Sequence, residues 1–459
     1  MGTQSATTVS VEPIDLGRLG PIVGDGRIEE LRAVARALAS LLDGRRIVHV
    51  NSTAAGGGVA EMLRTLVGYT RGAGLATEWV VIEGDAPFFA ITKRLHNGLY
   101  GGPGDGGELG ATEHAHYDRV TERNLELVRP LVRPGDVVIV HDPQPAGLVW
   151  SFRALGAHVI WRCHVGHDGG NEWTNRAWQF LRSYVEPAHA FVFSRERFAP
   201  SWIRRESLRV IPPSIDPFSP KNRELGRAEL LGLLRGAGLV ADGGAPPDAV
   251  AVRPATVVRR GSPPGAGVPL VVQVSRWDPM KDMAGVLAGF VEHVRPGEAR
   301  LVLAGPEVDG VDDDPEGGRV WRETVAAWEA LPPSSRARVQ LAAIPMDDLV
   351  ENALVVNALQ RHAAVVVQKS LAEGFGLTVA EAMWKTKPVV ASAVGGSSTR
   401  SSTARRGCSS AIPTTSPGSA PPWSVYWPTP RRRPGWGGTR VGASSAGSSA
   451  TGTCSTTRS

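Results

Sequence analysis

The strongest constraint on the fold is a regular alternation of short β-branched runs with amphipathic stretches, which begins at Arg46. Gly, Pro or Asp separates the segments, and this pattern is typical of βα units built on a parallel sheet. We therefore predict an α/β fold with two doubly wound domains whose boundary lies near Asn222. The predicted strands are Arg46–Asn51, Glu78–Ile82, Asp136–His141, Ala157–Cys163, Ala190–Ser194 and Leu208–Ile211, then Val268–Ser275, Ala299–Ala304, Ala337–Ala343, Ala363–Gln368 and Pro388–Ser392.

This pattern divides the chain into four parts. Residues 1–40 are an N-terminal extension, 41–221 the first domain, 222–396 the second domain and 397–459 a tail. Within the second domain, residues 235–267 are rich in Gly, Pro and Ala and show little periodicity. Such a composition predicts an insertion of low order, to which we assign no chemistry.

The composition limits the classes of function. The chain has 459 residues, 42% of them hydrophobic, which is enough for two cores. Its net charge of +5 comes from the tail, which holds eight Arg and no Lys, Asp or Glu; the first 396 residues carry 42 basic and 45 acidic groups, a net of −3. We therefore expect no nucleic-acid partner. No apolar run approaches twenty residues, so we expect no membrane association.

The cysteines and histidines indicate neither disulfides nor a metal site. Only Cys163, Cys408 and Cys454 are present, which gives no disulfide framework and no paired-Cys zinc pattern. His114 and His116 stand without a matched carboxylate or Cys. The first twenty residues lack a basic stretch followed by an apolar one, the mark of a secretion signal. We expect a reducing, cytoplasmic setting.

The tail resembles the product of a shifted reading frame. Residues 397–459 contain no Leu, Phe, Met, Asp or Glu, and the composition changes abruptly after Gly396. Such a segment cannot bury a core. The peptide Ser397–Ala404 can be encoded so that the neighbouring frame reads Ile-Val-Asp-Gln-Ile-Val-Asp-Gly, which is ordinary folded sequence. We therefore predict a disordered, out-of-frame tail; a genuine disordered basic tail is the alternative.

The strongest chemical motif is EGFGLTVAE at Glu373–Glu381, where two carboxylates flank a Gly-rich turn that follows a predicted strand. A helix is expected to begin near Thr378, and the free N–H groups and positive dipole end of a helix start favour phosphate. We expect Glu373 to lie beside a bound sugar and Glu381 beside a ribose. An acid-capped helix start is the plainer alternative.

A second motif adds two cations at the same sheet edge. Arg276 and Lys281 lie on the loop SRWDPMK, which follows the first predicted strand of the second domain. Because the carboxyl ends of parallel strands meet at one edge, this loop should face the Glu373 turn. The two cations could neutralise a diphosphate leaving group. The alternative is a pair of solvated surface charges.

The first domain offers weaker signals at its own sheet edge. The glycines of NSTAAGGGVAE, which follow the first strand and open a helix, form another anion cradle, although Gly triples are common in turns. Polar groups follow two further strands, and a crevice ligand would bind at that edge. They are Asp142 and Gln144 after one strand, and His164, His167 and Asp168 after the other.

Together these residues resemble the retaining glycosyltransferases of family 4, which have the GT-B fold of two Rossmann-like domains facing across a cleft. The likeness covers roughly residues 40–396 and is most specific at Arg276/Lys281, at Glu373/Glu381 and at Val394–Gly396. Within that family, HVNSTAAGGGVAEML, VIVHDPQPAGL, WRCHVGHD and IPPSIDP with SPKN resemble the trehalose-forming synthases and their trehalose phosphorylase relatives.

The resemblance implies reversible, retaining transfer of glucose from a nucleoside diphosphate glucose to glucose, which gives α,α-trehalose. It places the diphosphate on Arg276 and Lys281, the ribose on Glu381, the donor glucose on Glu373 and the reacting sugar near His164; these residues, Glu381 excepted, are the catalytic candidates. Further donor-binding candidates are Gly57, Gly58, Gly374, Phe375, Gly376, Leu377 and Thr378. The acceptor-binding candidates are Asp142, Gln144, His164, His167 and Asp168.

The resemblance also sets expectations for cofactors and partners. The nucleotide sugar is a co-substrate, no cofactor is tightly bound, and the motif requires no metal, although Mg²⁺ is compatible with it. Small sugars are the expected partners, and a homodimer is compatible. Family members continue past Gly395–Gly396 with further strands and helices, so we expect an incomplete second domain, low stability and weak or no activity.

Three functional interpretations remain open. The first is a nucleotide-sugar trehalose synthase, impaired by its C-terminus. The second is a phosphorylase that splits trehalose with inorganic phosphate. The third is a non-catalytic product of a damaged gene. A role of the Arg-bearing tail in nucleic-acid binding is the most distant, because it has no basic helix and no periodic aromatic residues.

The predicted frame change is tested by sequencing the gene across the codons for Val394–Thr399. We expect a single-base change to restore a Leu-bearing, amphipathic frame after Gly396. If no single-base insertion or deletion does so, the tail is an evolved segment and the prediction is wrong.

Overall fold

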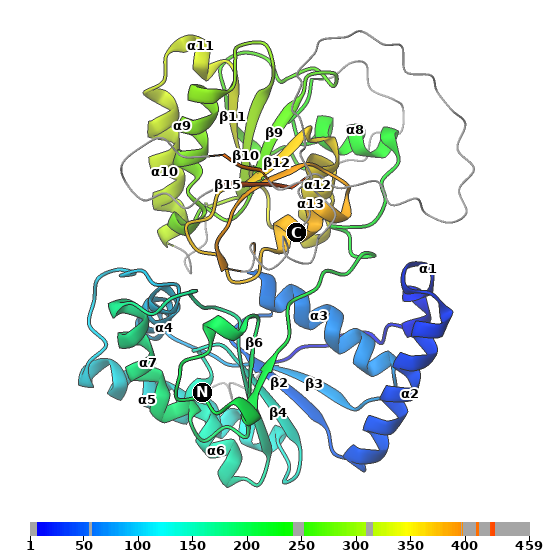
Figure 1. Ribbon diagram of the computed structural model, residues 1–459, viewed down its shortest axis with the longest axis vertical. Coiled ribbons are helices and arrows are strands. Elements are labelled where there is room, and N and C mark those ends of the chain that lie inside the picture. Colours follow the sequence, from blue (N-terminus) through cyan, green and yellow to red (C-terminus); the bar gives the residue numbers. More distant parts are fainter. Residues whose placement is uncertain are drawn as a thin grey trace, which may run out of the picture. The chain divides into compact units, whose positions relative to one another are not determined.

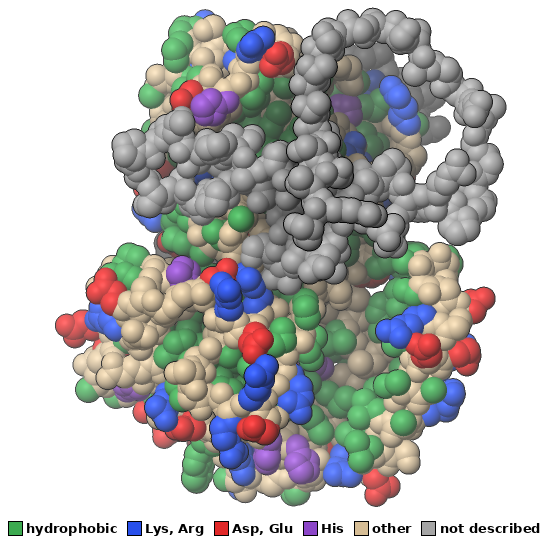
Figure 2. All heavy atoms as spheres, viewed as in Figure 1, with side chains coloured by type: hydrophobic (Ala, Val, Ile, Leu, Met, Phe, Trp, Pro, Cys, Tyr) green, Lys and Arg blue, Asp and Glu red, His purple; other side chains and the backbone are tan. Residues whose placement is uncertain are grey.

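The computed structural model describes residues 7–54, 57–241, 252–308, 315–395 and 397, together with 410–412 and 423–426. These residues form two separate sheets, each flanked by helices (Figure 1). On the face seen in Figure 2, side chains of both charge signs are interspersed over the described surface. No described helix has the length and apolarity needed to cross a membrane.

The first sheet has seven strands in the order β1-β3-β2-β4-β5-β6-β7. All neighbours pair in parallel except β1, which pairs antiparallel with β3 at the edge. The strands are β1 (Thr7–Thr8), β2 (Ile47–Asn51), β3 (Thr77–Val81), β4 (Val137–His141), β5 (His158–Cys163), β6 (Ala190–Phe193) and β7 (Leu208–Val210). The helices are α1 (Gly20–Val23), α2 (Asp25–Leu42), α3 (Gly57–Gly72), α4 (Ala86–Leu99), α5 (Ala111–Val128), α6 (Val149–Ala154) and α7 (Glu172–Val185).

The two faces of the first sheet bury different side chains. Val48 and Val50 of β2 belong to the large apolar cluster that includes residues of α4, α5 and α7. Trp79 of β3 belongs instead to a small cluster with Leu63 and Val67 of α3. Because side chains alternate along a strand, the residues of β2, β4 and β5 that lie between those of the large cluster face the α3 side.

The second sheet has eight strands in the order β14-β15-β13-β12-β9-β10-β11-β8. Its five central strands are parallel, and β8, β14 and β15 pair antiparallel at the edges. The strands are β8 (Thr256–Val258), β9 (Leu270–Val274), β10 (Arg300–Pro306), β11 (Val339–Ile344), β12 (Val365–Gln368), β13 (Val389–Ser392), β14 (Ser410–Ile412) and β15 (Trp423–Tyr426). The helices are α8 (Arg227–Gly236), α9 (Met283–His293), α10 (Pro315–Glu329), α11 (Pro333–Arg336), α12 (Leu349–His362) and α13 (Leu377–Trp384).

The prediction of two doubly wound α/β units is confirmed, and each of the eleven predicted strands overlaps an observed one. The strands that the sequence did not indicate are the short antiparallel edges β1, β8, β14 and β15. Within the segment 235–267, residues 242–251 lie outside the described part; in the rest, β8 pairs with β11 and Leu239 is fully buried, where the sequence predicted low order. The tail likewise contributes β14 and β15, where the sequence predicted no structure; most of its other residues lie outside the described part.

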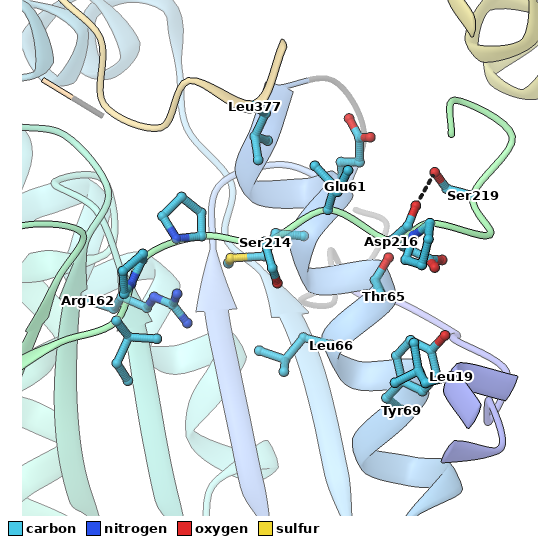
Figure 3. A pocket seen from close by; sticks show the side chains of 16 residues that line it. Leu19, Glu61, Thr65, Leu66, Tyr69, Arg162, Ser214, Asp216, Ser219 and Leu377 are labelled. Atoms are coloured by element: carbon cyan, nitrogen blue, oxygen red, sulfur yellow. Dashed lines mark hydrogen bonds between the residues drawn. The ribbon is translucent and has the colours of Figure 1, made fainter. Parts of the chain in front are cut away.

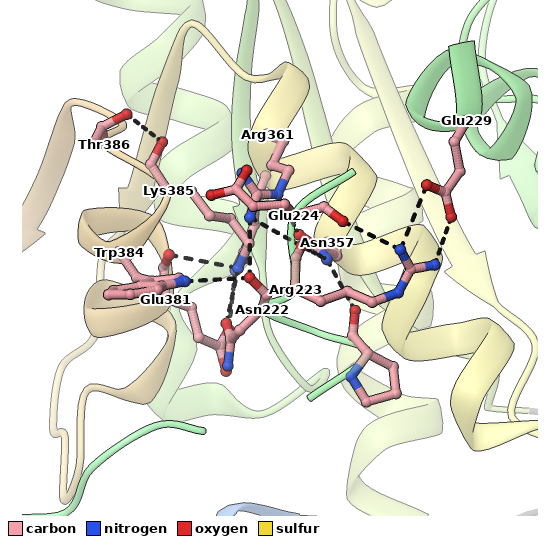
Figure 4. A network of polar contacts seen from close by, with 12 residues as sticks. Asn222, Arg223, Glu224, Glu229, Asn357, Arg361, Glu381, Trp384, Lys385 and Thr386 are labelled. Atoms are coloured by element: carbon pink, nitrogen blue, oxygen red, sulfur yellow. Dashed lines mark hydrogen bonds and ion pairs between the residues drawn. The ribbon is translucent and has the colours of Figure 1, made fainter. Parts of the chain in front are cut away.

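A polar network fastens the segment Pro220–Glu224 to the helices of the second sheet (Figure 4). The Asn357 amide of α12 donates to the carbonyl oxygens of Pro220 and Arg223, both at 2.9 Å. Lys385 donates to the side-chain oxygen of Asn222 at 3.0 Å and to Gln360 at 2.7 Å. Burial lowers the pKa of Lys385 to about 7 despite the nearby charge of Glu381.

The N-terminal segment around Ile14, here called the N-terminal strap, packs against α3 at Gly72. A Cβ at Gly72 would lie 1.9 Å from the Ile14 carbonyl oxygen, while Ile14 donates its N–H to Gly68 at 2.8 Å. We expect Gly72→Ala to lower the free energy of unfolding by about 1–3 kcal/mol, because the strap must move. The matched control is Gly26→Ala in α2, where no atom lies within 4 Å; it should be neutral or gain about 0.5–1 kcal/mol. Equal urea midpoints for the two variants would contradict this packing.

Candidate active site

The loop between β12 and α13 carries the EGFG motif and has space only for glycine at two positions. Gly376 precedes α13 with φ of 64°, a left-handed conformation that suits glycine. A Cβ on Gly374 would lie 2.5 Å from the His164 carbonyl oxygen and 2.8 Å from the Tyr100 hydroxyl. Gly374 therefore lets this loop lie against His164 and Tyr100 of the first domain. Leu377 and Thr378 follow as the first residues of α13.

Glu373 and Lys281 form a buried ion pair. The Lys281 Nζ lies 2.8 Å from Glu373 Oε2, which also accepts a hydrogen bond from the Ser370 hydroxyl at 3.0 Å. Burial alone would raise the pKa of the Glu373 carboxyl. The charge of Lys281 and the hydrogen bonds from Lys281, the Gly376 N–H and Ser370 outweigh burial and hold this pKa below its usual range. Glu373 is thus an ionised acceptor at neutral pH.

Arg276 lies on the same β9 loop, and its orientation depends on Asp278. The guanidinium contacts Asp278 Oδ2 at 3.1 Å and remains 45% exposed. The other oxygen of Asp278 accepts the Met280 N–H at 2.8 Å and so caps the short turn that ends at Lys281. The structure therefore brings the two predicted cations to the Glu373 loop. We did not predict a role for Asp278 in this site, although an Asp that precedes Pro commonly caps the start of a helix.

Glu381 is buried on α13 in a separate charged group. Its Oε2 accepts from Gln360 at 3.1 Å, and its Oε1 lies 3.9 Å from Lys221. Lys221 also contacts Glu61 of α3 at 2.6 Å. Burial opposes the charge on Lys221, but Glu381 and Glu61 together raise the pKa of its ammonium. The sequence analysis assigned no role to Lys221 or Glu61, although both lie in segments that carry the family resemblance.

The glycines at the start of α3 meet the motif loop directly. A Cβ on Gly58 would lie 3.1 Å from Leu377 and 3.3 Å from the Phe375 ring, so a larger side chain would press on both. Gly57 begins the helix with φ of 76°. Residues 55 and 56 lie outside the described part. The predicted glycine cradle is therefore placed beside the predicted donor loop.

Three histidines form a hydrogen-bonded chain beneath this loop. His49 Nδ1 lies 3.0 Å from His141 Nε2, and His141 Nδ1 lies 2.9 Å from His164 Nε2. The His164 ring contacts Phe375, with centroids 5.0 Å apart. Burial first, then neighbouring positive charge from Arg162 or another histidine, lowers the pKa of all three rings, that of His49 to about 3. Each neutral ring carries one N–H, so the tautomer of His49 and that of His164 are coupled through His141.

The remaining acceptor candidates are distributed unevenly. Asp142, with φ of 63°, accepts the His164 N–H at 2.7 Å, and burial raises its pKa to about 7. Asp168 pairs with Arg195 at 2.7 Å, and His167 accepts the Gly169 N–H. Among the described contacts none joins Gln144 or His167 to the Glu373 loop. Among the described contacts, His164 is therefore the acceptor candidate that meets the motif loop, and Asp142 holds the His164 backbone.

Comparison with families and solved structures matches this architecture. Residues 49–200 match the family described as "Trehalose synthase, N-terminal domain" and residues 268–411 that described as "Glycosyl transferases group 1". A trehalose-6-phosphate synthase structure aligns with a TM-score of 0.57 at 13% identity, over 77% of this chain and 86% of that one. The chain is thus a glycosyltransferase enzyme with the GT-B fold.

Curated relatives define the family more narrowly. The chain is 37% identical to the trehalose synthase of Rubrobacter xylanophilus over 80% of this chain and 79% of the relative. It is 36% identical to that of Thermococcus litoralis over 82% and 80%. A trehalose phosphorylase of Pleurotus sajor-caju is 25% identical, over 76% of this chain and 49% of the relative. This chain belongs to the trehalose synthase family of glycosyltransferases.

The histidine chain predicts a loss of stability in mild acid. The pKa of His49 falls from 6.5 in the unfolded chain to about 3 in the folded one, so the unfolded state binds more protons between these values. The contribution of His49 to stability is therefore full above pH 6.5 and declines as the pH falls toward 3, by up to about 1.4 kcal/mol per pH unit. Asp142, whose pKa burial raises to about 7, contributes in the opposite direction over part of this range, so the effect of His49 is read as the difference between wild type and variant.

We expect His49→Leu to flatten this decline in urea unfolding between pH 6.5 and 4.5. His293→Gln, at an exposed position of α9, is the control and should keep the wild-type slope. An unchanged slope in His49→Leu would show that His49 is accessible to protons in the folded protein.

Proposed function

We propose that the chain transfers glucose from a nucleoside diphosphate glucose to the anomeric hydroxyl of free glucose, giving α,α-trehalose with retention. The observation that carries the proposal is the Lys281–Glu373 ion pair, with Arg276 on the same loop and the first turn of α13 beside it. The trehalose synthase relatives at 36–37% identity support the product.

The cations act on the leaving group in this proposal. As the bond between the glucose C1 and the diphosphate oxygen breaks, negative charge grows on the diphosphate. Arg276, Lys281 and the free N–H groups at the start of α13 stabilise that charge better than they stabilise the bound donor. No tightly bound cofactor is needed for this step.

Glu373 positions the donor in this proposal. An ionised carboxylate accepts hydrogen bonds from sugar hydroxyls, and its contacts with Lys281 and Ser370 fix its direction. His164, neutral and packed against Phe375, lies next to the same loop. The acceptor oxygen attacks C1 on the face that the diphosphate leaves, and its proton passes to the departing phosphate oxygen. Bond breaking and bond making at C1 are then balanced without a covalent enzyme intermediate.

Phosphorolysis of trehalose is the second candidate, favoured only by the distant phosphorylase relatives. These are 23–25% identical, and the match spans about half of their length. The two reactions differ in the leaving group of the glucosyl donor. In the synthase reaction it is a nucleoside diphosphate, and in the phosphorylase reaction it is inorganic phosphate.

The proposal is tested by measuring trehalose from glucose with each nucleoside diphosphate glucose, on this chain and on a frame-restored version. We expect Glu373→Gln and Lys281→Met each to lower kcat by about 10²–10³, as removal of one charge-stabilising group commonly does. Arg319→Met, an exposed cation of α10, is the matched control and should leave kcat unchanged.

Other outcomes separate the alternatives. Full activity in Glu373→Gln would contradict the proposal. Product formed only from glucose 1-phosphate would assign the chain to phosphorolysis. Absence of a cooperative melt in the chain as given, with activity in the frame-restored version, would identify the third interpretation, a damaged gene.

A further inference from the structure

A cavity of about 280 Å³ lies on the α3 side of the first sheet, apart from the ion pair of the motif loop (Figure 3). Its walls are α3, the segment Ile211–Ser219 and Leu377. Apolar side chains such as Met62, Leu66 and Ile215 form much of the lining. None of Glu373, Lys281, Arg276 and His164 lines it; of the donor-binding candidates only Leu377 does, through an apolar side chain.

Arg162 projects into one end of this cavity (Figure 3). Among the described residues, no hydrogen bond or ion pair reaches its guanidinium. Burial lowers the pKa of Arg162, an effect that Asp142 only opposes at a distance. The nearby His49, His141 and His164 are neutral and supply no countercharge. A half-buried guanidinium with no ion-pair partner among the described residues is favourably placed to bind an anion.

Tyr69 gives a second unsatisfied group in the same cavity. Its hydroxyl is buried and has no hydrogen-bond partner among the described residues. The two carboxylates that also line the cavity are already engaged: Glu61 by Lys221 at 2.6 Å, and Asp216 by the Phe218 N–H at 2.9 Å. In Figure 3 these groups lie on the side of the cavity opposite Arg162. The cavity is therefore cationic at the Arg162 end, whereas the other end offers the Tyr69 hydroxyl beside the carboxylates of Glu61 and Asp216.

We propose that this cavity binds a small hydroxylated anion, with its phosphate or carboxylate group on Arg162 and a hydroxyl at Tyr69. Arg presents a planar fork of donors that matches either anionic group. The volume is near the lower end of the roughly 300–1,000 Å³ of small-molecule sites, which suits a single phosphorylated or acidic sugar. The site is additional to the proposed glucosyl transfer and does not depend on it.

Calorimetric titration of the full chain, without nucleotide, tests the proposal with four probes: glucose 6-phosphate, gluconate, inorganic phosphate and glucose. We expect at least one of the two sugar anions to bind more tightly than glucose. Tighter binding of glucose 6-phosphate or of gluconate identifies the anionic group as phosphate or carboxylate. If inorganic phosphate binds as tightly as glucose 6-phosphate and gluconate do, the sugar hydroxyls add nothing to the affinity, and the proposed contact with Tyr69 is wrong.

Substitutions locate the site. Arg162→Met should weaken binding of the preferred sugar anion at least tenfold, and Tyr69→Phe should weaken it severalfold. Arg36→Met, an exposed cation of α2, is the control and should have no effect. Unchanged affinity in Arg162→Met, or no binding of any probe at millimolar concentration, would overturn the proposal.

Two further measurements do not depend on the variants folding. In the wild-type chain, the preferred anion should slow amide hydrogen exchange in the segments 65–69 and 211–216. Slowing confined to residues 373–381 would place the anion on the donor loop and overturn the proposal. A nucleoside diphosphate should not compete with the anion; full competition would make Arg162 part of the donor site. Glucosyl transfer is measured in a separate assay. Absence of anion binding to this cavity therefore does not contradict the proposed glucosyl transfer.

Discussion

The pairing of the buried Glu373 carboxylate with Lys281 is the interaction on which the arrangement of the site depends. A buried carboxylate without a cation would take up a proton or force its loop open. The pair therefore fixes the loop after β12 against the loop after β9, and with it the start of α13. Gly374 lets this loop lie against the His164 backbone of the first domain, where a Cβ would collide, and Gly376 supplies the left-handed conformation that precedes α13.

The first sheet satisfies its buried polar groups in a different way. On its α3 side, His49 and His141 bond to each other and to His164 without a charge, while Arg162 beside them has no ion-pair partner among the described residues. At the motif loop, the second domain thus contributes the Lys281–Glu373 ion pair and the first domain the neutral ring of His164. This division fits a site in which one partner carries a diphosphate and the other only hydroxyl groups, as the proposed reaction requires.

Sequence alone predicted the parallel strands because most are short apolar runs rich in β-branched residues and largely buried, as Ile47–Asn51 is. It did not predict β1 or β8, which are two and three residues long and carry no periodic signal. The motif loops were predicted because the pairs Arg276/Lys281 and Glu373/Glu381 have the sequence spacing found in family 4 glycosyltransferases. Lys221 and the histidine chain were not predicted, because their contacts join residues that are far apart in the sequence, 160 positions for Lys221 and Glu61. No local pattern encodes such contacts. Asp278 is different, since its contacts with Arg276 and Met280 are local.

The position of Lys221 between two carboxylates limits which substitutions this family can accept in evolution. The Lys221 ammonium lies between Glu61 of α3 and Glu381 of α13. A change of charge at any one of these three residues therefore alters the electrostatic energy of the other two. Loss of Lys221 alone would leave two carboxylates close together, and loss of either carboxylate would remove one of the two charges that compensate Lys221. Accepted substitutions at these sites should therefore arise in linked sets, and a descendant that abandons the lysine should be recognisable by neutral residues at both acidic positions.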